Sequence, residues 1–310
     1  MKCRPRIHHA PEVVQERNTH DLQIMCSIGV IIPTFGRREL AGKTVDRISS
    51  QLNSEDVVVV PLVREEDFPQ NVSKNVVILK CEKGSAKQRN SALRYLETKQ
   101  NKVDLVVFLD DDVVLSPSFF IELRAIHSRF PQAAGFTFRL IDDGVGKGGI
   151  GYDAACELAE SFTCENIHER FIERRDCYGG FSMTGEHLGV VEFDERLAEY
   201  GFLEDWDFYS RLRANGPTGH SPGTTLVHLG VASGRVSDRK FGYAQIVNPI
   251  YLVLKGTLPF LDGVRYSMLS PFSNALRFYQ TERRNRLLGN LLGLFTLLTR
   301  GAKPELVARL

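Results

Sequence analysis

The 310-residue chain lacks the features that mark secreted and disulfide-rich proteins. Its six cysteines are scattered, without a CxxC pair or a cysteine and histidine spacing typical of zinc, so we expect reduced thiols. The basic residues from Met1 to Arg6 are not followed by the apolar segment of a secretory signal. We therefore predict a cytoplasmic protein whose residues 1–25 form a flexible segment.

Long hydrophobic runs are also missing. The longest apolar stretch, Leu287 to Thr299, lies between Arg286 and Arg300. As a helix it would extend about 20 Å, whereas the core of a bilayer measures roughly 30 Å. No segment is therefore expected to cross a membrane.

The chain has almost no net charge, but basic residues are in excess at its C-terminal end. The net charge of +1 excludes the strong positive field of a typical nucleic-acid-binding protein. From Lys255 to Leu310, nine basic residues face three acidic ones, a local charge of +6, which leaves −5 for residues 1–254. A basic tail on an acidic body suggests an anionic surface as a partner.

Short apolar runs alternate with helical periodicity in the first part of the chain. Buried strands are predicted at residues 28–33, 57–60, 76–79 and 103–109, with helices at 37–51 and 84–95. This alternation is typical of a doubly wound α/β sheet, in which ligands bind beyond the carboxyl ends of the strands.

The pattern is less regular beyond residue 140. Five glycines between Asp142 and Gly151 predict a loop. Helices are expected at residues 152–173 and 201–215, and strands at 177–184 and 224–229. Leucines and arginines between Thr281 and Gly301 indicate a basic amphipathic helix, and residues 241–310 are predicted to form a helical extension.

Three adjacent carboxylates, Asp110, Asp111 and Asp112, follow the fourth predicted strand. Two like charges about 4 Å apart repel by roughly 4 kcal/mol at an effective dielectric near 20. A divalent cation removes this repulsion, and oxygen ligands suit Mn²⁺ or Mg²⁺, which in turn stabilise a diphosphate leaving group. The alternative is a solvated acidic turn before Ser116 and Pro117.

With its preceding strand, this aspartate cluster resembles the DxD motif of the family 2 glycosyltransferases. Further segments are similar to that family in the same order, namely Val30 to Arg37, the GxxxxRN segment Gly84 to Asn90, the ED segment Gly201 to Asp207, and Val227-His228 followed by Gly230. The resemblance implies the GT-A fold, a Rossmann-like mixed and mostly parallel sheet flanked by helices. It assigns residues 26–140 to a nucleotide-sugar half and 141–240 to an acceptor half.

The resemblance also implies an inverting, metal-dependent transfer of a hexose from a nucleotide-diphosphate sugar to a hydroxyl acceptor. The expected general base is Asp205, with Glu204 orienting the acceptor, and the expected metal ligands are Asp112, Asp110 and His228. Donor contacts are expected from Pro33, Thr34, Phe35, Arg37, Lys83, Gly84, Arg89, Asn90, Asp110 and Asp111. Acceptor contacts are expected from Gly180, Phe181 and Trp206.

Each assignment has a structural alternative. Asp205 could be a solvent-facing residue near a helix N-terminus, Trp206 a core residue, and Arg89 the partner of a nearby acid. The family commonly has an acid at the end of the second strand, whereas this chain has its acids only at Glu65, Glu66 and Asp67. The nucleotide is therefore left open.

The predicted acceptor is a glycan or a lipid-linked glycan, and no nucleic-acid partner is expected. The C-terminal helix is expected either to lie on the inner membrane face, as a peripheral contact, or to cover a core or form an oligomer. Competing functions are a nucleotidyltransferase, which would favour a richer glycine loop after the first strand, and a catalytically inactive nucleotide-sugar-binding module. A phosphatase would need a threonine soon after the aspartates, where this chain has Val113 and Val114.

Overall fold

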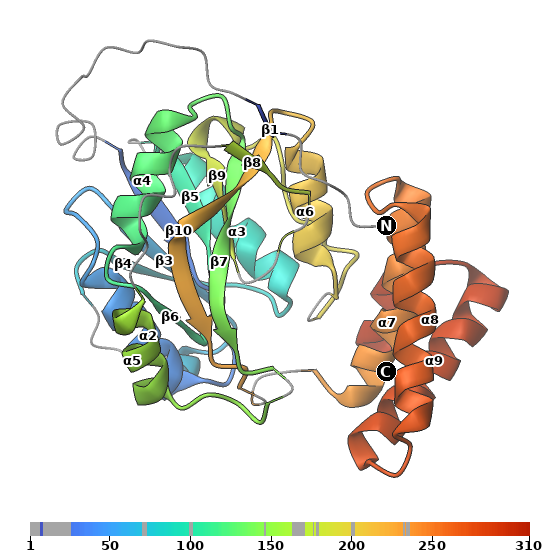
Figure 1. Ribbon diagram of the computed structural model, residues 1–310. Coiled ribbons are helices and arrows are strands. Elements are labelled where there is room, and N and C mark those ends of the chain that lie inside the picture. Colours follow the sequence, from blue (N-terminus) through green and yellow to red (C-terminus); the bar gives the residue numbers. More distant parts are fainter. Residues whose placement is uncertain are drawn as a thin grey trace. The chain divides into compact units, whose positions relative to one another are not determined.

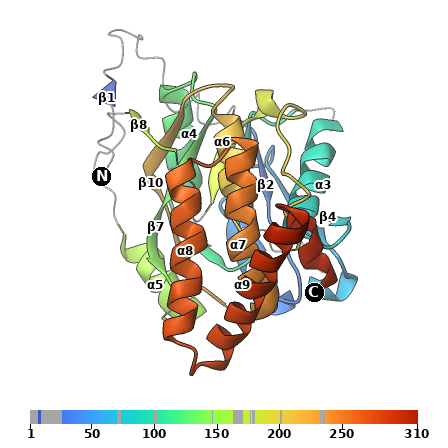
Figure 2. The ribbon, with the colours of Figure 1, turned by 90° about the vertical axis from the view of Figure 1, so that its right-hand side faces the viewer.

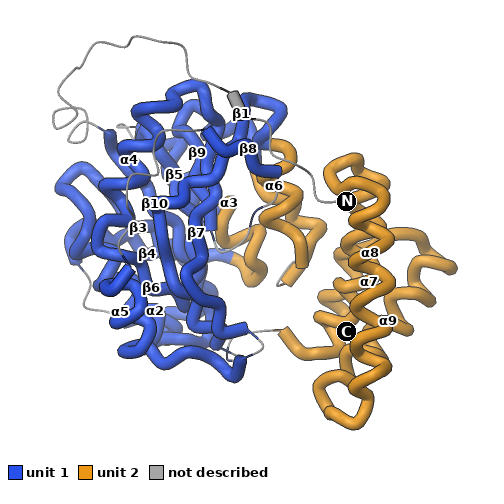
Figure 3. The backbone as a smooth tube through the Cα atoms, in the orientation of Figure 1, with its two compact units in different colours: residues 1–81, 91–191, 212–233 blue, residues 82–90, 192–211, 234–310 orange. Residues whose placement is uncertain are grey.

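The computed structural model describes residues 7–8, 26–69, 73–98, 102–145, 147–162, 171–175, 177, 180–199, 202–231, 233 and 236–310. The chain divides into two compact units, coloured separately in Figure 3. Unit 1 comprises residues 1–81, 91–191 and 212–233, and unit 2 comprises residues 82–90, 192–211 and 234–310. The flexibility predicted for residues 1–25 concerns a segment that, apart from Ile7–His8, lies outside the described residues.

Unit 1 is built on a mixed sheet, which has ten strands in the described part of the chain (Figure 1). The strand order is β1-β8-β10-β7-β9-β5-β2-β3-β4, and β6 pairs with β10. One half is parallel and consists of β2 (Ile28–Ile31), β3 (Val57–Leu62), β4 (Val76–Lys80) and β5 (Leu105–Phe108). The other half consists of β1 (Ile7–His8), β6 (Val113–Leu115), β7 (Gly135–Asp143), β8 (Phe171–Glu173), β9 (Phe181–Thr184) and β10 (Thr218–His228).

Helices cover both faces of the parallel half. Ile28, Val30 and Ile32 pack in one buried cluster with residues of α2 (Arg38–Ser49) and α4 (Phe119–Arg129). On the other face, a Cβ added to Gly29 would lie 2.8 Å from the side chain of Leu96 in α3 (Ser85–Thr98). Strands β2, β3 and β5 are buried on both faces and are continuous apolar runs, as the sequence predicted. The burial predicted for residues 76–79 is wrong, because β4 is an edge strand that is only partly buried, with Ile78 40% exposed. The α/β fold is confirmed.

Several boundaries differ from those predicted. The predicted helix 152–173 is wrong at its end, because α5 (Tyr152–Ser161) stops and residues 171–173 form β8. Strand β8 pairs with β10, and Phe171 packs against Phe130 and Phe136, so tertiary pairing overrides the local periodicity. The predicted strand 224–229 begins earlier, at Thr218, and the predicted loop begins later, because β7 continues to Asp143. Strands β6 and β7 and helix α4 were not predicted.

Unit 2 is helical. It contains most of α6 (Glu204–Leu212), together with α7 (Asp238–Lys255), α8 (Phe260–Leu276), α9 (Thr281–Arg300) and the short 3-10 helix η3 (Pro304–Arg309). Figure 2 looks onto α7, α8 and α9. Among the described residues, none of the helices is both long and apolar enough to span a membrane.

Candidate functional site

The three consecutive aspartates follow β5 at the carboxyl end of the parallel strands, and each has different surroundings. Asp110 is half-buried, whereas Asp111 and Asp112 are 5% and 2% exposed. Two buried carboxylates at adjacent positions need hydrogen bonds and positive charge to remain in the fold. Asp111 and Asp112 share the guanidinium of Arg37, and their other partners differ.

Asp111 is held by the loop after β2. Its carboxylate accepts a 2.7 Å hydrogen bond from the hydroxyl of Thr34 and a 2.6 Å bond from Nη1 of Arg37. Burial, with a smaller contribution from the charge of Asp112, raises the pKa of Asp111 to about 6 against the opposing effect of Arg37. These contacts fasten Asp111 into the protein, and the donor contact expected of it stays a prediction.

Asp112 faces the segment that follows β10. One carboxylate oxygen accepts a 3.0 Å hydrogen bond from the backbone N–H of Val231 and lies 3.2 Å from Nη1 of Arg37. The other lies 3.3 Å from Nε2 of His228. Burial favours the neutral form, but the bond to His228 and the charge of Arg37 outweigh it, so the pKa of Asp112 lies below its ordinary value.

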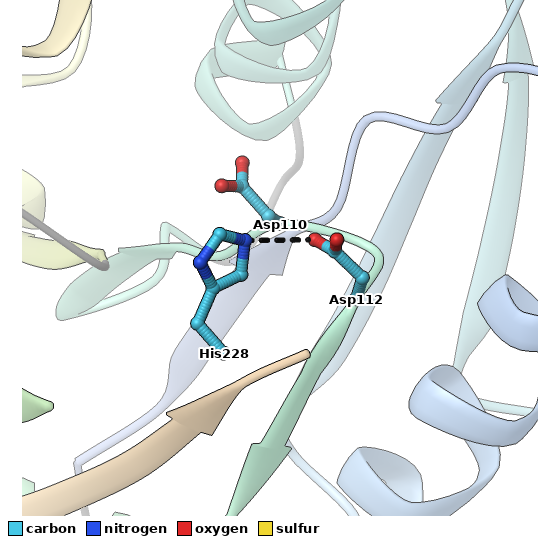
Figure 4. A group of neighbouring side chains, drawn as sticks. All are labelled: Asp110, Asp112 and His228. Carbon is cyan, nitrogen blue, oxygen red and sulfur yellow. Dashed lines mark ion pairs between the residues drawn. The ribbon is translucent and has the colours of Figure 1, made fainter. Parts of the chain in front are cut away.

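Asp110, Asp112 and His228 converge on one point, as Figure 4 shows. One ligand atom from each residue lies within 4.8 Å of the other two. Two carboxylate oxygens and an imidazole nitrogen form a donor set that suits Mn²⁺ and accommodates Mg²⁺. The residues therefore fit a divalent cation.

The imidazole of His228 is oriented by a second acid. Its Nδ1 lies 2.9 Å from Asp143, which leaves Nε2 directed at Asp112. Burial alone would lower the pKa of His228, but the hydrogen bond and charge of Asp112, with Asp110 and Asp143, raise it to about 9. A carboxylate behind a histidine is a common outer partner of a metal-binding imidazole. Asp143 could not be selected from the sequence, because it lies in the predicted glycine-rich loop.

Arg37 connects the cluster to the chain after β10. Its guanidinium donates to Asp111 and also to the backbone carbonyls of Val231 and Ser233, at 2.9 and 2.5 Å. Arg37 thus fixes the position of the segment that supplies the N–H bond to Asp112. The donor contact expected of Arg37 stays a prediction.

A second polar group lies at the end of β3. Arg64 donates a 2.8 Å hydrogen bond to the buried carboxylate of Asp67, and its guanidinium lies 5.0 Å from the ring centroid of Phe35. Thr34 forms a parallel bridge to Leu62 at the same edge. Of the three acids that follow this strand in the sequence, Asp67 is the buried one. Arg64 was not selected from the sequence, although its i,i+3 spacing from Asp67 was visible.

The predicted catalytic acids lie in unit 2, at the start of α6. Glu204 is buried and accepts a 3.0 Å hydrogen bond from the hydroxyl of Ser85, while Asp205 has a side chain that is 33% exposed. Nη1 of Arg89 lies 3.4 Å from both carboxylates and also bonds Ser85. Arg89 thus pairs with nearby acids, which is the structural alternative that the sequence left open for it. The contact expected between Arg89 and the nucleotide sugar stays a prediction.

The backbone before α6 is strained and is held by ion pairs. Glu199 and Leu203 have positive φ values of 65° and 73°, which are unfavourable for side chains with a Cβ. Both carboxylate oxygens of Glu199 are paired, with Lys83 at 2.9 Å and Lys240 at 3.1 Å. Burial opposes ionisation, but these two partners lower the pKa of Glu199 below its ordinary value. Ser85, Glu199 and Lys240 were not selected from the sequence.

Other predicted site residues have structural contacts. Asn90 is fully buried and exchanges hydrogen bonds with the backbone of Phe193. Trp206 packs against the cluster of Leu197, Leu252 and Leu258, and its indole N–H donates to the carbonyl of Thr257 at 3.1 Å.

The two remaining acceptor residues lie in unit 1. Phe181 is 1% exposed and stacks on Phe108 at 4.6 Å, and the acceptor contact expected of it stays a prediction. Gly180 has a φ of 112°, and a Cβ there would lie 2.9 Å from the carbonyl oxygen of Phe108. Gly84 also adopts a positive φ, of 133°. Pro33 is half-buried in the loop after β2.

Glu204 predicts an unusual dependence of stability on pH. Burial, together with the charge of Asp205, raises the pKa of Glu204 from 4.5 to about 8. Because the protonated form is favoured in the folded state, its contribution to the free energy of unfolding is complete below the unfolded pKa and is lost as the pH rises through about 8. The Tm, measured by thermal unfolding at a series of pH values, should therefore fall more steeply with rising pH for the wild type than for Glu204→Gln.

The matched control for this measurement is Glu282→Gln, at an exposed position of α9. Its curve should parallel that of the wild type. A Glu204→Gln curve that also runs parallel to the wild type would show that Glu204 ionises normally in the folded protein.

Comparison with known proteins adds information on the fold. No protein-family model and no curated protein sequence matches the chain. Among solved structures, the mannosyltransferase PcManGT from Pyrobaculum calidifontis, in complex with GDP-Man and Mn²⁺, is 14% identical with a TM-score of 0.50 over 91% of this chain and 78% of that one. S. aureus TarS is 16% identical with a TM-score of 0.51 over 84% of this chain. TarS 1-349 in complex with UDP-GlcNAc is 15% identical with a TM-score of 0.50, over 91% of this chain and 83% of that one.

The chain has a GT-A-like fold. It spans 44% of the length of the TarS chain with which it aligns. At these identities the likeness concerns the arrangement of the strands and helices, and the chemistry has to be argued from the residues of this chain.

Proposed function

We propose that the protein is a metal-dependent glycosyltransferase that moves a sugar from a nucleotide-diphosphate sugar to a hydroxyl group. The observation that carries the proposal is the convergence of Asp110, Asp112 and His228 at the carboxyl end of β5. In open α/β sheets this is the edge at which nucleotides bind. The mannosyltransferase that shares the fold is in complex with GDP-Man and Mn²⁺.

The proposed metal site belongs to unit 1. Asp112, Asp110 and His228 would hold Mn²⁺ or Mg²⁺, which when bound supplies positive charge to the departing diphosphate. Asp143 orients the imidazole, and the N–H of Val231 orients the carboxylate of Asp112. Pro33, Thr34 and Phe35 lie in the loop after β2 and are the proposed neighbours of the nucleotide.

The proposed catalytic acids belong to unit 2. Asp205 is the proposed general base, because its carboxylate is partly exposed and can take the proton of an acceptor hydroxyl. Glu204 is the proposed positioning residue: burial and the charge of Asp205 raise its pKa, and Arg89 contacts both acids. In this proposal, the base that takes the hydroxyl proton is separate from the group that stabilises the leaving diphosphate, as in an inverting transfer.

The nucleotidyltransferase alternative is not favoured. The turn after β2 contains one glycine, Gly36, and its basic residue Arg37 is bonded to Asp111 and to backbone carbonyls. The acceptor is proposed to be a glycan or lipid-linked glycan, in accordance with the resemblance of the sequence.

The test is a thermal-shift panel of nucleotide-diphosphate sugars measured with and without Mn²⁺. A ligand at 100 times its Kd stabilises the folded state by about 2.7 kcal/mol, which raises the Tm of a protein of this size by several degrees. We expect one or a few donors to stabilise the protein only in the presence of the metal. UDP-GlcNAc and GDP-Man are the first to be tried. Absence of stabilisation by every nucleotide sugar in the panel would contradict the proposal.

A further inference from the structure

Helices α8 and α9 expose their apolar side chains. On α8, Met268, Leu269 and Phe272 are more than half exposed, and Leu261 and Leu276 continue the same series at helical spacing. On α9, four apolar residues at helical spacing are at least half exposed, namely Leu291, Leu294, Phe295 and Leu298. Phe278 and Tyr279, in the turn between the helices, are also exposed. A water-exposed surface with this many large apolar side chains normally marks a binding face.

The fully buried positions of these helices are small or polar, and two partly buried leucines of α9, Leu292 and Leu297, pack beside them against Tyr243 and Val247. The buried residues of α8 are Gly263 and Asn274, and those of α9 are Gly289, Asn290 and Gly293. A Cβ on Gly289 would lie 2.0 Å from the carbonyl oxygen of Arg239 in α7, and one on Gly242 would lie 2.0 Å from that of Arg286 in α9. The backbones of α7 and α9 are therefore in direct contact, without side chains between them.

Amide side chains join the three helices where the glycines bring them together. Asn274 of α8 donates to Asn290 of α9 at 2.9 Å and to Gln245 of α7 at 3.1 Å. Asn290 in turn donates to the carbonyl of Gly242 at 2.7 Å. All three amides are at most 7% exposed.

This packing departs from the usual amphipathic order, because many large apolar residues face water while glycines and amides take the most buried positions. Glycines spaced as Gly289-xxx-Gly293, buried interhelical amides and outward leucines are typical of helices packed in lipid. No described helix can span a bilayer, so an interfacial location parallel to the surface is the arrangement that fits.

Basic residues accompany the exposed apolar face. Arg265 lies within the exposed series of α8, Arg277 follows that helix, and Arg284 and Arg300 lie at the two ends of α9. Residues 255–310 carry the excess of basic residues described above. Arginines beside an apolar face add electrostatic attraction to anionic lipid headgroups. The same charges oppose the close approach of a second copy of the chain.

We propose that α8 and α9 dock this protein on the surface of an anionic lipid bilayer, with their exposed leucines, Met268 and the phenylalanines inserted among the acyl chains. This inference goes beyond the proposed function and does not rest on it. Aromatic residues such as Phe278 and Tyr279 would lie at headgroup depth, where their rings are favoured.

The experiment is vesicle flotation with the full chain. The protein should float with vesicles containing phosphatidylglycerol and only weakly with pure phosphatidylcholine, and high salt should reduce its binding. The triple variant Leu269→Ser, Phe272→Ser, Leu276→Ser should reduce partitioning at least about tenfold, because three apolar side chains leave the interface. The charge variant Arg265→Gln, Arg277→Gln, Arg284→Gln should lose the preference for anionic lipid.

The matched control is Ile121→Ser, Leu158→Ser, Val190→Ser, which removes three exposed apolar side chains from unit 1. It should float like the wild type. Equal flotation of all variants would overturn the proposal. So would a wild type that ignores vesicles and sediments as a dimer that the α8 variant disperses. Donor-dependent thermal shifts, measured on the same samples, report folding and the proposed function independently of the vesicle result.

Discussion

Asp112→Asn is expected to abolish Mn²⁺-dependent stabilisation by the nucleotide-diphosphate donor and to lower kcat/KM about a hundredfold or more. Loss of an outer partner of a metal ligand already costs about 10- to 100-fold, so a direct ligand should cost at least as much. The substitution keeps the shape of the side chain and an oxygen for the N–H of Val231, but it removes the charge that faces His228 and the proposed metal. Donor titrations by thermal shift and steady-state kinetics measure both effects.

Two neighbouring substitutions separate this explanation from general damage. Asp143→Asn removes only the charge behind the imidazole and should reduce metal affinity less than Asp112→Asn does. Asp111→Asn should lower the Tm with little change in metal dependence, because Asp111 bonds Thr34 and Arg37. If Asp112→Asn retained metal-dependent donor binding, the assignment of the metal site would be wrong.

The different roles of these aspartates mark the limit of what the sequence could predict. The strand before them was predictable because four consecutive apolar residues, Leu105 to Phe108, are buried on both faces. Which carboxylate faces inward depends on the pairing of β5 with β2, since that register brings Thr34 and Arg37 to Asp111. Nothing local to the three aspartates carries this information.

Contacts between residues far apart in the chain were even harder to predict from the sequence. Ser85 and Glu204 lie 119 residues apart in the chain, and their hydrogen bond exists only once α3 and α6 have packed. The helices of residues 241–310 could be predicted from periodicity, but periodicity does not say which face turns inward. Gly289 and Asn290 take the most buried positions of α9, while Leu291 and Leu298 are exposed.

Asp205→Asn should lower kcat about 10²- to 10⁴-fold while the Kd for the donor and the metal stays unchanged. A positioned base contributes a factor of this size to proton transfer, and asparagine cannot accept the proton. The change keeps the size of the side chain beside Arg89 and removes only its charge. Single-turnover transfer measured with saturating donor isolates the chemical step from binding.

The matched control lies two residues further along the same helix. Asp207 is fully buried and accepts bonds from Arg211, Lys255 and Thr257, so Asp207→Asn should destabilise the protein by about 3 kcal/mol. At a temperature where it remains folded, its kcat should stay near that of the wild type. Asp205→Asn should show the opposite combination, a normal Tm and a lost rate, because its carboxylate is needed for the acceptor proton and not for the packing of α6. Transfer by Asp205→Asn at the wild-type rate would assign the base to another residue, even if the metal site proved correct.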